Sequence, residues 1–138
     1  MAIARSKQVS IDYVLEADRA LPATEQTVFQ LRPLSNATML AIENLMQVDT
    51  SGQAVSMRTG DAKLVALHAG LAGWKNLRDE SGSDVVFRRE TGRRVVLGIT
   101  IEDPAAAESI EVLRVDDARE LANAIIAGNR LTVADAKN

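Results

Sequence analysis

The stretch TGDAKLVALHAGLAGWKNLRDESGSDVVF, residues 59–87, contains the strongest helix pattern in the chain and the polar loop that follows it. Its large apolar residues recur every three or four positions, at Leu64, Leu67, Leu71 and Trp74. This spacing predicts an amphipathic helix that begins near Thr59–Asp61 and ends at Trp74. Gly70 and Gly73 each cost a helix about 1 kcal/mol relative to alanine, so we expect another segment to pack closely against them.

Upstream of this helix, two alternating runs predict an antiparallel hairpin. Val9, Ile11 and Tyr13 alternate with polar residues, and a second such run covers 27–32 before Pro33. Alternation with a period of two is typical of half-buried strands. Apolar residues at helical spacing then predict a helix over 36–48, capped by Ser35 or Asn36 and ended by the polar residues 49–52.

Downstream, a polar loop over 78–84 leads to a second predicted hairpin, with strands at 85–87 and 94–97 and a turn at 90–92. Glu102-Asp103-Pro104 ends its second strand, and residues 105–113 fit either a short helix or a loop. A last helix begins with Asp117-x-x-Glu120 as a capping box, buries Leu121, Ala122 and Ile125, and stops at Gly128-Asn129. Residues 132–138 are either one further helical turn or a flexible tail.

These elements predict an α+β fold in a single domain, with about three helices packed against two small antiparallel hairpins. A chain of 138 residues and 14.9 kDa suits one domain that buries about two thirds of its unfolded surface. No apolar run approaches the ~18 residues of a membrane span, and the N-terminus is too polar for a secretory signal. With no cysteine, the sequence fits a reducing cytoplasm and excludes disulfides and thiolate metal sites.

Signatures of catalysis are missing from the sequence. GxxxxGK[ST], GxGxxG, GxSxG and HExxH are absent, and His68, the only histidine, lies beside the apolar stripe where we expect a structural role. The segment Asp79–Glu90 has acidic and serine residues at calcium-loop positions, but Asp84 stands where the sharp turn needs glycine. We therefore expect neither an enzyme nor a bound cofactor or metal ion.

The densest cationic patch consists of Arg88, Arg89, Arg93 and Arg94 around the tip of the second predicted hairpin. Such a patch is suited to clamp a phosphate group or an acidic protein, because guanidinium groups bind carboxylates bidentately. The alternative is a solvated hairpin whose charges protect an edge strand from aggregation. A formal net charge of −3 and the lack of a basic recognition helix favour a protein partner over nucleic acid.

The segment around the only tryptophan, Trp74, resembles a pattern found in a known class of proteins. It contains the pattern W-x-N-x-x-D-x-x-G-x-x-x-x-F, formed by Trp74, Asn76, Asp79, Gly82 and Phe87. This pattern resembles small morphogenesis proteins of tailed bacteriophages, many of them tail assembly chaperone-like. Residues 27–34 are similar to the early strand of these proteins, and residues 120–125, 129–132 and 137–138 to their C-terminal helix and tail. The hairpin over Arg88–Thr100 is longer than that pattern implies.

The resemblance implies a non-enzymatic protein that acts through protein contacts in tail or neck assembly, in the cytoplasm of a bacterial host. Its partners would be tail, neck or capsid proteins, together with further copies of itself and no membrane. The expected contact arm is the region 79–94, and the predicted interface residues are Trp74, Asn76, Asp79, Arg88, Arg89, Arg93 and Arg94. Trp74 either closes the core over a helix end or anchors that interface, and the N-terminal hairpin offers an edge for strand addition.

Two alternatives to a transient assembly factor remain open from the sequence. The first is a permanent virion subunit, such as a connector or a capsid-decorating protein. The second is a small nucleic-acid-associated regulator that uses the arginine patch and loses affinity steeply as salt rises.

Overall fold

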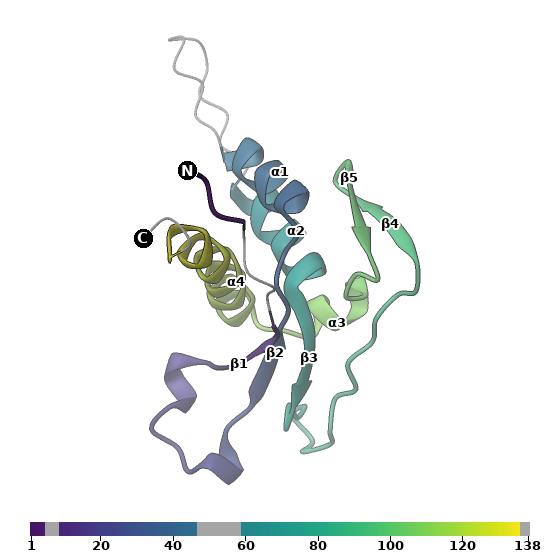
Figure 1. The fold of residues 1–138 in the computed structure, drawn as a ribbon. Coiled ribbons are helices and arrows are strands. Elements are labelled where there is room, and N and C mark those ends of the chain that lie inside the picture. Colours follow the sequence, from purple (N-terminus) through teal and green to yellow (C-terminus); the bar gives the residue numbers. More distant parts are fainter. Residues whose placement is uncertain (5–8, 47–58, 136–138) are drawn as a thin grey trace, which may run out of the picture.

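The computed structural model describes residues 1–4, 9–46 and 59–135, which form four helices and two antiparallel sheets (Figure 1). The helices are α1 (Asn36–Met46), α2 (Thr59–Gly70), α3 (Ala107–Glu111) and α4 (Val115–Asp135). The larger sheet has the order β1-β2-β3 and consists of β1 (Ile11–Val14), β2 (Val28–Leu31) and β3 (Leu71–Lys75). The smaller sheet pairs β4 (Arg93–Val96) with β5 (Ile99–Glu102). Two 3-10 turns, η1 (Glu16–Asp18) and η2 (Ala23–Glu25), lie between β1 and β2. The predicted α+β class is confirmed.

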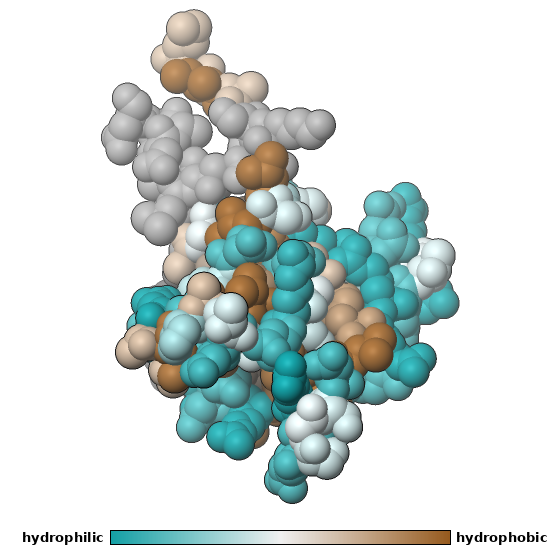
Figure 2. Space-filling model, turned by 90° about the horizontal axis from the view of Figure 1, so that it is seen from below, coloured by the Kyte–Doolittle hydropathy of each residue, from teal (hydrophilic) through white to brown (hydrophobic). Residues whose placement is uncertain are grey.

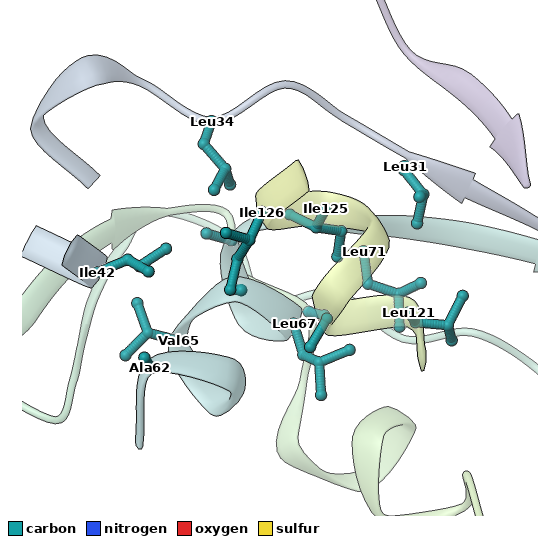
Figure 3. Close-up of a cluster of buried hydrophobic side chains, with 14 of the residues drawn as sticks. Leu31, Leu34, Ile42, Ala62, Val65, Leu67, Leu71, Leu121, Ile125 and Ile126 are labelled. Atoms are coloured by element: carbon teal, nitrogen blue, oxygen red, sulfur yellow. The ribbon is translucent and has the colours of Figure 1, made fainter. Parts of the chain in front are cut away.

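The hydrophobic core lies where α1, α2 and α4 meet the larger sheet (Figure 3). α2 packs between α1 and α4 and runs directly into β3, so one continuous segment crosses the centre of the molecule (Figure 1). The largest fully buried side chains include one from each of five elements, namely Phe29, Ile42, Val65, Leu71 and Leu121. Aliphatic residues dominate this core because the chain has only four aromatic side chains.

The N-terminal half follows the sequence prediction. β1 and β2 pair antiparallel, with Ile11 opposite Leu31 and Tyr13 opposite Phe29. The hydroxyl oxygen of Ser35 accepts a hydrogen bond from the backbone N–H of Thr38 (3.1 Å), so Ser35, one of the two predicted candidates, caps α1. The predicted end of that helix at 49–52 lies outside the described residues, as do residues 136–138 of the predicted tail.

The prediction of one helix from 59 to 74 is wrong in its second half, because α2 ends at Gly70 and residues 71–75 form β3. β3 pairs antiparallel with β2 and has an irregularity opposite Gln30 and Leu31. The three-residue spacing of Leu71 and Trp74 fits a helix and would place the two side chains on opposite faces of a regular strand. The irregularity in β3 sets them opposite Leu31 and Phe29, which share one face of β2, so the strand can form. The predicted two-stranded hairpin thereby becomes a three-stranded sheet.

The second predicted hairpin is displaced along the chain. Residues 85–87 form no strand, and the strands are β4 and β5 with a turn at Leu97-Gly98. Both turn residues have positive φ (49° and 79°), as a type I′ turn requires. The predicted turn around Gly92 instead leads from residues 88–90 into the start of β4. Residues 88–90 form backbone hydrogen bonds with residues 104–106. Residues 107–111 form the short helix α3.

The predicted helix stop at Gly128-Asn129 is also wrong, because α4 continues to Asp135. The Asn129 side chain accepts a hydrogen bond from the backbone N–H of Leu34 (3.0 Å) and donates one to the Ile125 carbonyl (2.8 Å). Asn129 therefore ties α4 to the start of α1 instead of ending the helix. Glu120 does not complete a capping box either, since its carboxylate contacts β1 and η1.

Gly70 marks the tightest contact between elements, and it gives a first test of this packing. A Cβ atom at Gly70 would lie 2.5 Å from Cγ2 of Ile125 on α4, whereas one at Gly60 of the same helix would meet nothing within 4 Å. We expect Gly70→Ala to lower the free energy of unfolding by about 1–3 kcal/mol through overpacking. Gly60→Ala should leave it unchanged or raise it by up to about 1 kcal/mol.

Chemical denaturation of both variants measures this difference. The cost of Gly70→Ala should shrink when Ile125 is first replaced by alanine, because the clashing branch is then gone. Equal effects of Gly70→Ala and Gly60→Ala would show that the contact with Ile125 does not limit the packing.

Candidate functional site

The structure places Trp74 inside an aromatic cluster. Its ring lies edge-on to Phe29 (6.2 Å between centroids) and to Phe87 (5.0 Å). Its indole N–H donates a hydrogen bond to the Val85 carbonyl (2.7 Å). Trp74 therefore holds the segment after β3 against the sheet. Because the ring is partly buried and its N–H is used internally, little of it is left to anchor a partner.

Asn76 and Asp79 shape the turn that follows β3. Asn76 has a positive φ (62°) and donates through its side-chain amide to the carbonyls of Thr24 and Gln26 (3.3 and 3.2 Å), which connects this turn to η2. The Asp79 carboxylate accepts hydrogen bonds from the backbone N–H groups of Ser81 and Ser83 (3.0 Å each). The Asp79 side chain thus bonds to backbone N–H groups, whereas the Asn76 side chain bonds to backbone carbonyls.

The Asp79 loop is exposed and polar. Hydrogen bonding, chiefly from the Ser81 side chain, lowers the pKa of the Asp79 carboxyl below its ordinary value. The loop lies at the lower end of the molecule in Figure 1, and the view from below is largely hydrophilic (Figure 2). Its conformation is fixed by its own hydrogen bonds, so it is a rigid surface feature.

Each of the four predicted interface arginines has a partner within the chain. Arg88 lies 4.0 Å from Glu108, Arg93 3.1 Å from Glu102, and Arg94 3.3 Å from Glu90. Arg89 donates to the Ala72 carbonyl (3.1 Å). All three ion pairs are exposed, and such pairs are worth about 0–1 kcal/mol, so a binding partner can replace them at small cost. The arginines stand along the base of the β4–β5 hairpin, and their role in an interface stays a prediction.

Sequence reasoning missed Arg32, which joins three parts of the fold. Its Nε donates to the Ala69 carbonyl near the end of α2, and its Nη2 donates to the carbonyls of Glu102 and Asp103 at the end of β5 (2.7 and 3.1 Å). Its backbone N–H bonds to the Gly70 carbonyl (2.8 Å). Half-burial lowers the pKa of the Arg32 guanidinium from its ordinary value. A lone arginine before proline gives no sequence signal for this role.

The feature most suited to bind another molecule is a groove between the edge strand β1 and α4. β1 pairs only with β2 among the described strands, so its other edge is open. The groove measures about 610 Å³ and has an apolar floor that includes Ile11, Ala124 and Ala127. Ile11 is 51% exposed, which is high for a large apolar side chain in a strand. We name this surface the β1 groove.

The rim of the β1 groove is acidic. Among the residues that the structure describes, Glu16, Asp116 and Glu120 line it together with Arg119, which bonds to Asp116 (3.1 Å). The pKa of the neighbouring Asp117 is raised, mainly because the carboxyl is partly buried. The positive charge of Arg114 lowers this pKa, and the negative charge of Glu120 raises it further. Burial is the main cause of this shift, so the acidic character of the rim rests on its three carboxylates.

Tyr13 and Glu120 connect the two walls of the β1 groove. The Tyr13 hydroxyl donates to the Glu120 carboxylate (2.8 Å), which also accepts from the backbone N–H of Glu16 (3.0 Å). The Arg19 guanidinium lies over the Tyr13 ring at 5.5 Å. The alternation of Ile11 and Tyr13 predicted the strand wall, but nothing in the sequence placed α4 beside it.

Among residues 1–4, 9–46 and 59–135, no group of three His, Cys, Asp or Glu side chains could hold a metal ion. Within the same residues, no helix combines the length and the apolar character that crossing a bilayer requires. Comparison with protein-family models, with characterised proteins and with solved structures finds no match for this chain.

Tyr13 is the only tyrosine, so its ionisation gives a direct test of the groove. Burial, the hydrogen bond to Glu120 and the charge of Glu120 raise the pKa of Tyr13 above its ordinary value of 10.0. The contribution of Tyr13 to the free energy of unfolding is therefore fully present below the pKa that Tyr13 has in the unfolded chain. This contribution is lost as the pH rises through the pKa that Tyr13 has in the folded protein. We expect absorbance at the tyrosinate band to show a higher pKa in folded than in denatured protein.

Glu120→Gln should lower the folded pKa of Tyr13, because the amide still accepts the hydrogen bond but carries no charge. Glu16→Gln is the matched control and should shift the pKa less, since Glu16 is the weakest of the contributing groups. Identical titration of the folded and the denatured protein would contradict this geometry.

Proposed function

We propose that this chain is a non-enzymatic protein of tailed-phage morphogenesis that acts by binding other proteins during tail or neck assembly. The observation that carries the proposal is the open edge of β1 above an apolar groove. An open strand edge offers unpaired backbone groups, and a groove beside it gives room for alternate side chains of an added strand. The phage context comes from the resemblance in residues 74–87, 27–34 and 120–132.

The surroundings of the titratable groups support a role without catalysis. His68 is buried, and its Nδ1 lies 2.7 Å from the carbonyl oxygen of Ala105. The His68 carbonyl in turn accepts the backbone N–H of Ala105 (2.9 Å), so this histidine joins α2 to the segment before α3. It lies apart from the β1 groove, whose lining contains carboxylates and one arginine.

The proposed partners are tail, neck or capsid proteins in the cytoplasm of a bacterial host. A transient assembly factor and a permanent virion subunit would use the same surface, and they differ in whether the chain stays in the finished particle. We favour the transient factor because the resemblance is to proteins of the assembly chaperone type.

Affinity purification of the tagged chain from a lysate of its source cells, followed by mass spectrometry, tests the proposal. We expect tail, neck or capsid proteins to be captured by the wild-type chain. Ile11→Asp should reduce this capture at least about tenfold. A bound partner would bury the new carboxylate on the groove floor without a counter-charge, which costs several kcal/mol of binding free energy. Val112→Asp is the matched control, since Val112 is exposed to the same degree (52% against 51%) and lies outside the groove.

Mass spectrometry of purified particles separates the two kinds of phage protein, because only a virion subunit remains there. Capture of nucleic acid with steep salt dependence, without particle proteins, would overturn the proposal in favour of a regulator. Equal capture by wild type and Ile11→Asp would remove the β1 groove from it.

A further inference from the structure

Among the described strands, β4 has a second open edge, on the opposite side of the molecule from β1 (Figure 1). The β4–β5 hairpin projects from the body, with β5 nearer to α1 and β4 on the outside (Figure 1). Ile101 of β5 is buried, whereas Val95 of β4 is 69% exposed. A two-stranded sheet is marginally stable alone, so an outer strand of this kind gains from a further neighbour.

The register of the hairpin shows which backbone groups face outward. Val96 and Ile99 flank the two-residue turn, and such a pair is hydrogen-bonded. Because bonded pairs alternate in antiparallel strands, the N–H and C=O groups of Arg93 and Val95 point away from β5. The Arg93 carbonyl accepts a hydrogen bond from the exposed Arg94 guanidinium (3.0 Å), which a neighbouring strand can replace.

The charges of the two edges are opposite. Residues 88–102, which contain β4, hold four arginines against two glutamates. Within the described part of the chain, the β1 groove is lined by three carboxylates and one arginine. Both strands are four residues long, and on β4 the side chains of Arg93 and Val95 share one face. Such a face matches a groove with an apolar floor and an acidic rim.

We propose that β4 of one copy adds to the β1 edge of a second copy, so that the chain associates with itself head to tail. Val95 then lies over the floor formed by Ile11 and Ala124, and Arg93 faces the carboxylates of the rim. Because the two edges lie on opposite sides of one molecule, each copy keeps one free edge and further copies can add. A contact of this type closes into a ring or extends as a filament.

This inference rests on the proposed protein-binding role of the β1 groove and names its occupant. Two short strands bury less than a standard interface of about 1,600 Å², so we expect a dissociation constant between about 10 µM and 1 mM. Sedimentation equilibrium of the purified full chain across this range should show an average mass that rises with concentration. The rise should weaken with added salt, because the rim charges are exposed.

Two variants and two matched controls identify the surfaces. Val95→Asp and Ile11→Asp should each weaken self-association about tenfold or more. Val86→Asp (exposed to 71%) and Val112→Asp should leave it unchanged, because both valines lie outside the two edges. Far-UV circular dichroism and thermal unfolding check that each variant folds. If Ile11→Asp fails to fold, Glu16→Arg with Asp116→Arg replaces it, since both side chains are exposed.

Mixing the two defective variants tests the head-to-tail arrangement. The intact groove of Val95→Asp and the intact β4 of Ile11→Asp can form one contact, so the mixture should yield a dimer that does not grow. A mixture that stays monomeric while the wild type associates would overturn the proposal, because the intact groove of one variant and the intact β4 of the other then do not bind each other. A wild-type chain that stays monomeric at 1 mM would overturn it too. Capture of particle proteins is measured separately, so either proposal can fail while the other stands.

Discussion

The contact between Gly70 and Ile125 is the constraint on which the rest of the fold depends. At this point α2 ends, β3 begins and α4 crosses, and the backbone of one element touches the side chain of another without room for a methyl group. Close packing there lets β3 leave α2 without a loop and lie beside β2. The sheet, the two flanking helices and the core between them follow from this crossing.

Arg32 fixes the β4–β5 hairpin relative to that crossing. It binds carbonyl groups at the end of α2 and just after β5, so the hairpin base is held by charge-assisted hydrogen bonds while its outer strand stays exposed. The opposite side of the molecule has a similar arrangement, because Glu120 holds Tyr13 and η1 and leaves the β1 edge open. Both open edges are therefore held in place by side chains, Arg32 and Glu120, that are hydrogen-bonded within the fold.

Rigid open edges have a functional consequence. A strand edge that is already in place binds without a large ordering cost, so even a short added strand can give measurable affinity. The predicted interface residues fall into two groups, those that maintain the fold and those that are exposed. Trp74, Asn76 and Asp79 maintain the turn after β3, whereas Arg93 and Arg94 stand on an exposed strand and are held by surface ion pairs and one exposed hydrogen bond. The arginines are thus the members of that set with freedom to meet a partner.

The sequence by itself determined the α+β class, the first hairpin and a cap of α1 at Ser35 or Asn36, because these depend on local alternation and on side chains close in the chain. It did not determine where α2 ends, since Leu71 and Trp74 continue the helical spacing and only pairing with β2, with its irregularity opposite Gln30 and Leu31, makes this segment a strand. Nor did it place Asn129 or Glu120, whose hydrogen-bond partners lie 95 and 107 positions away. The β1 groove belongs to this second group, because its walls come from opposite ends of the chain and exist only once the core has brought them together.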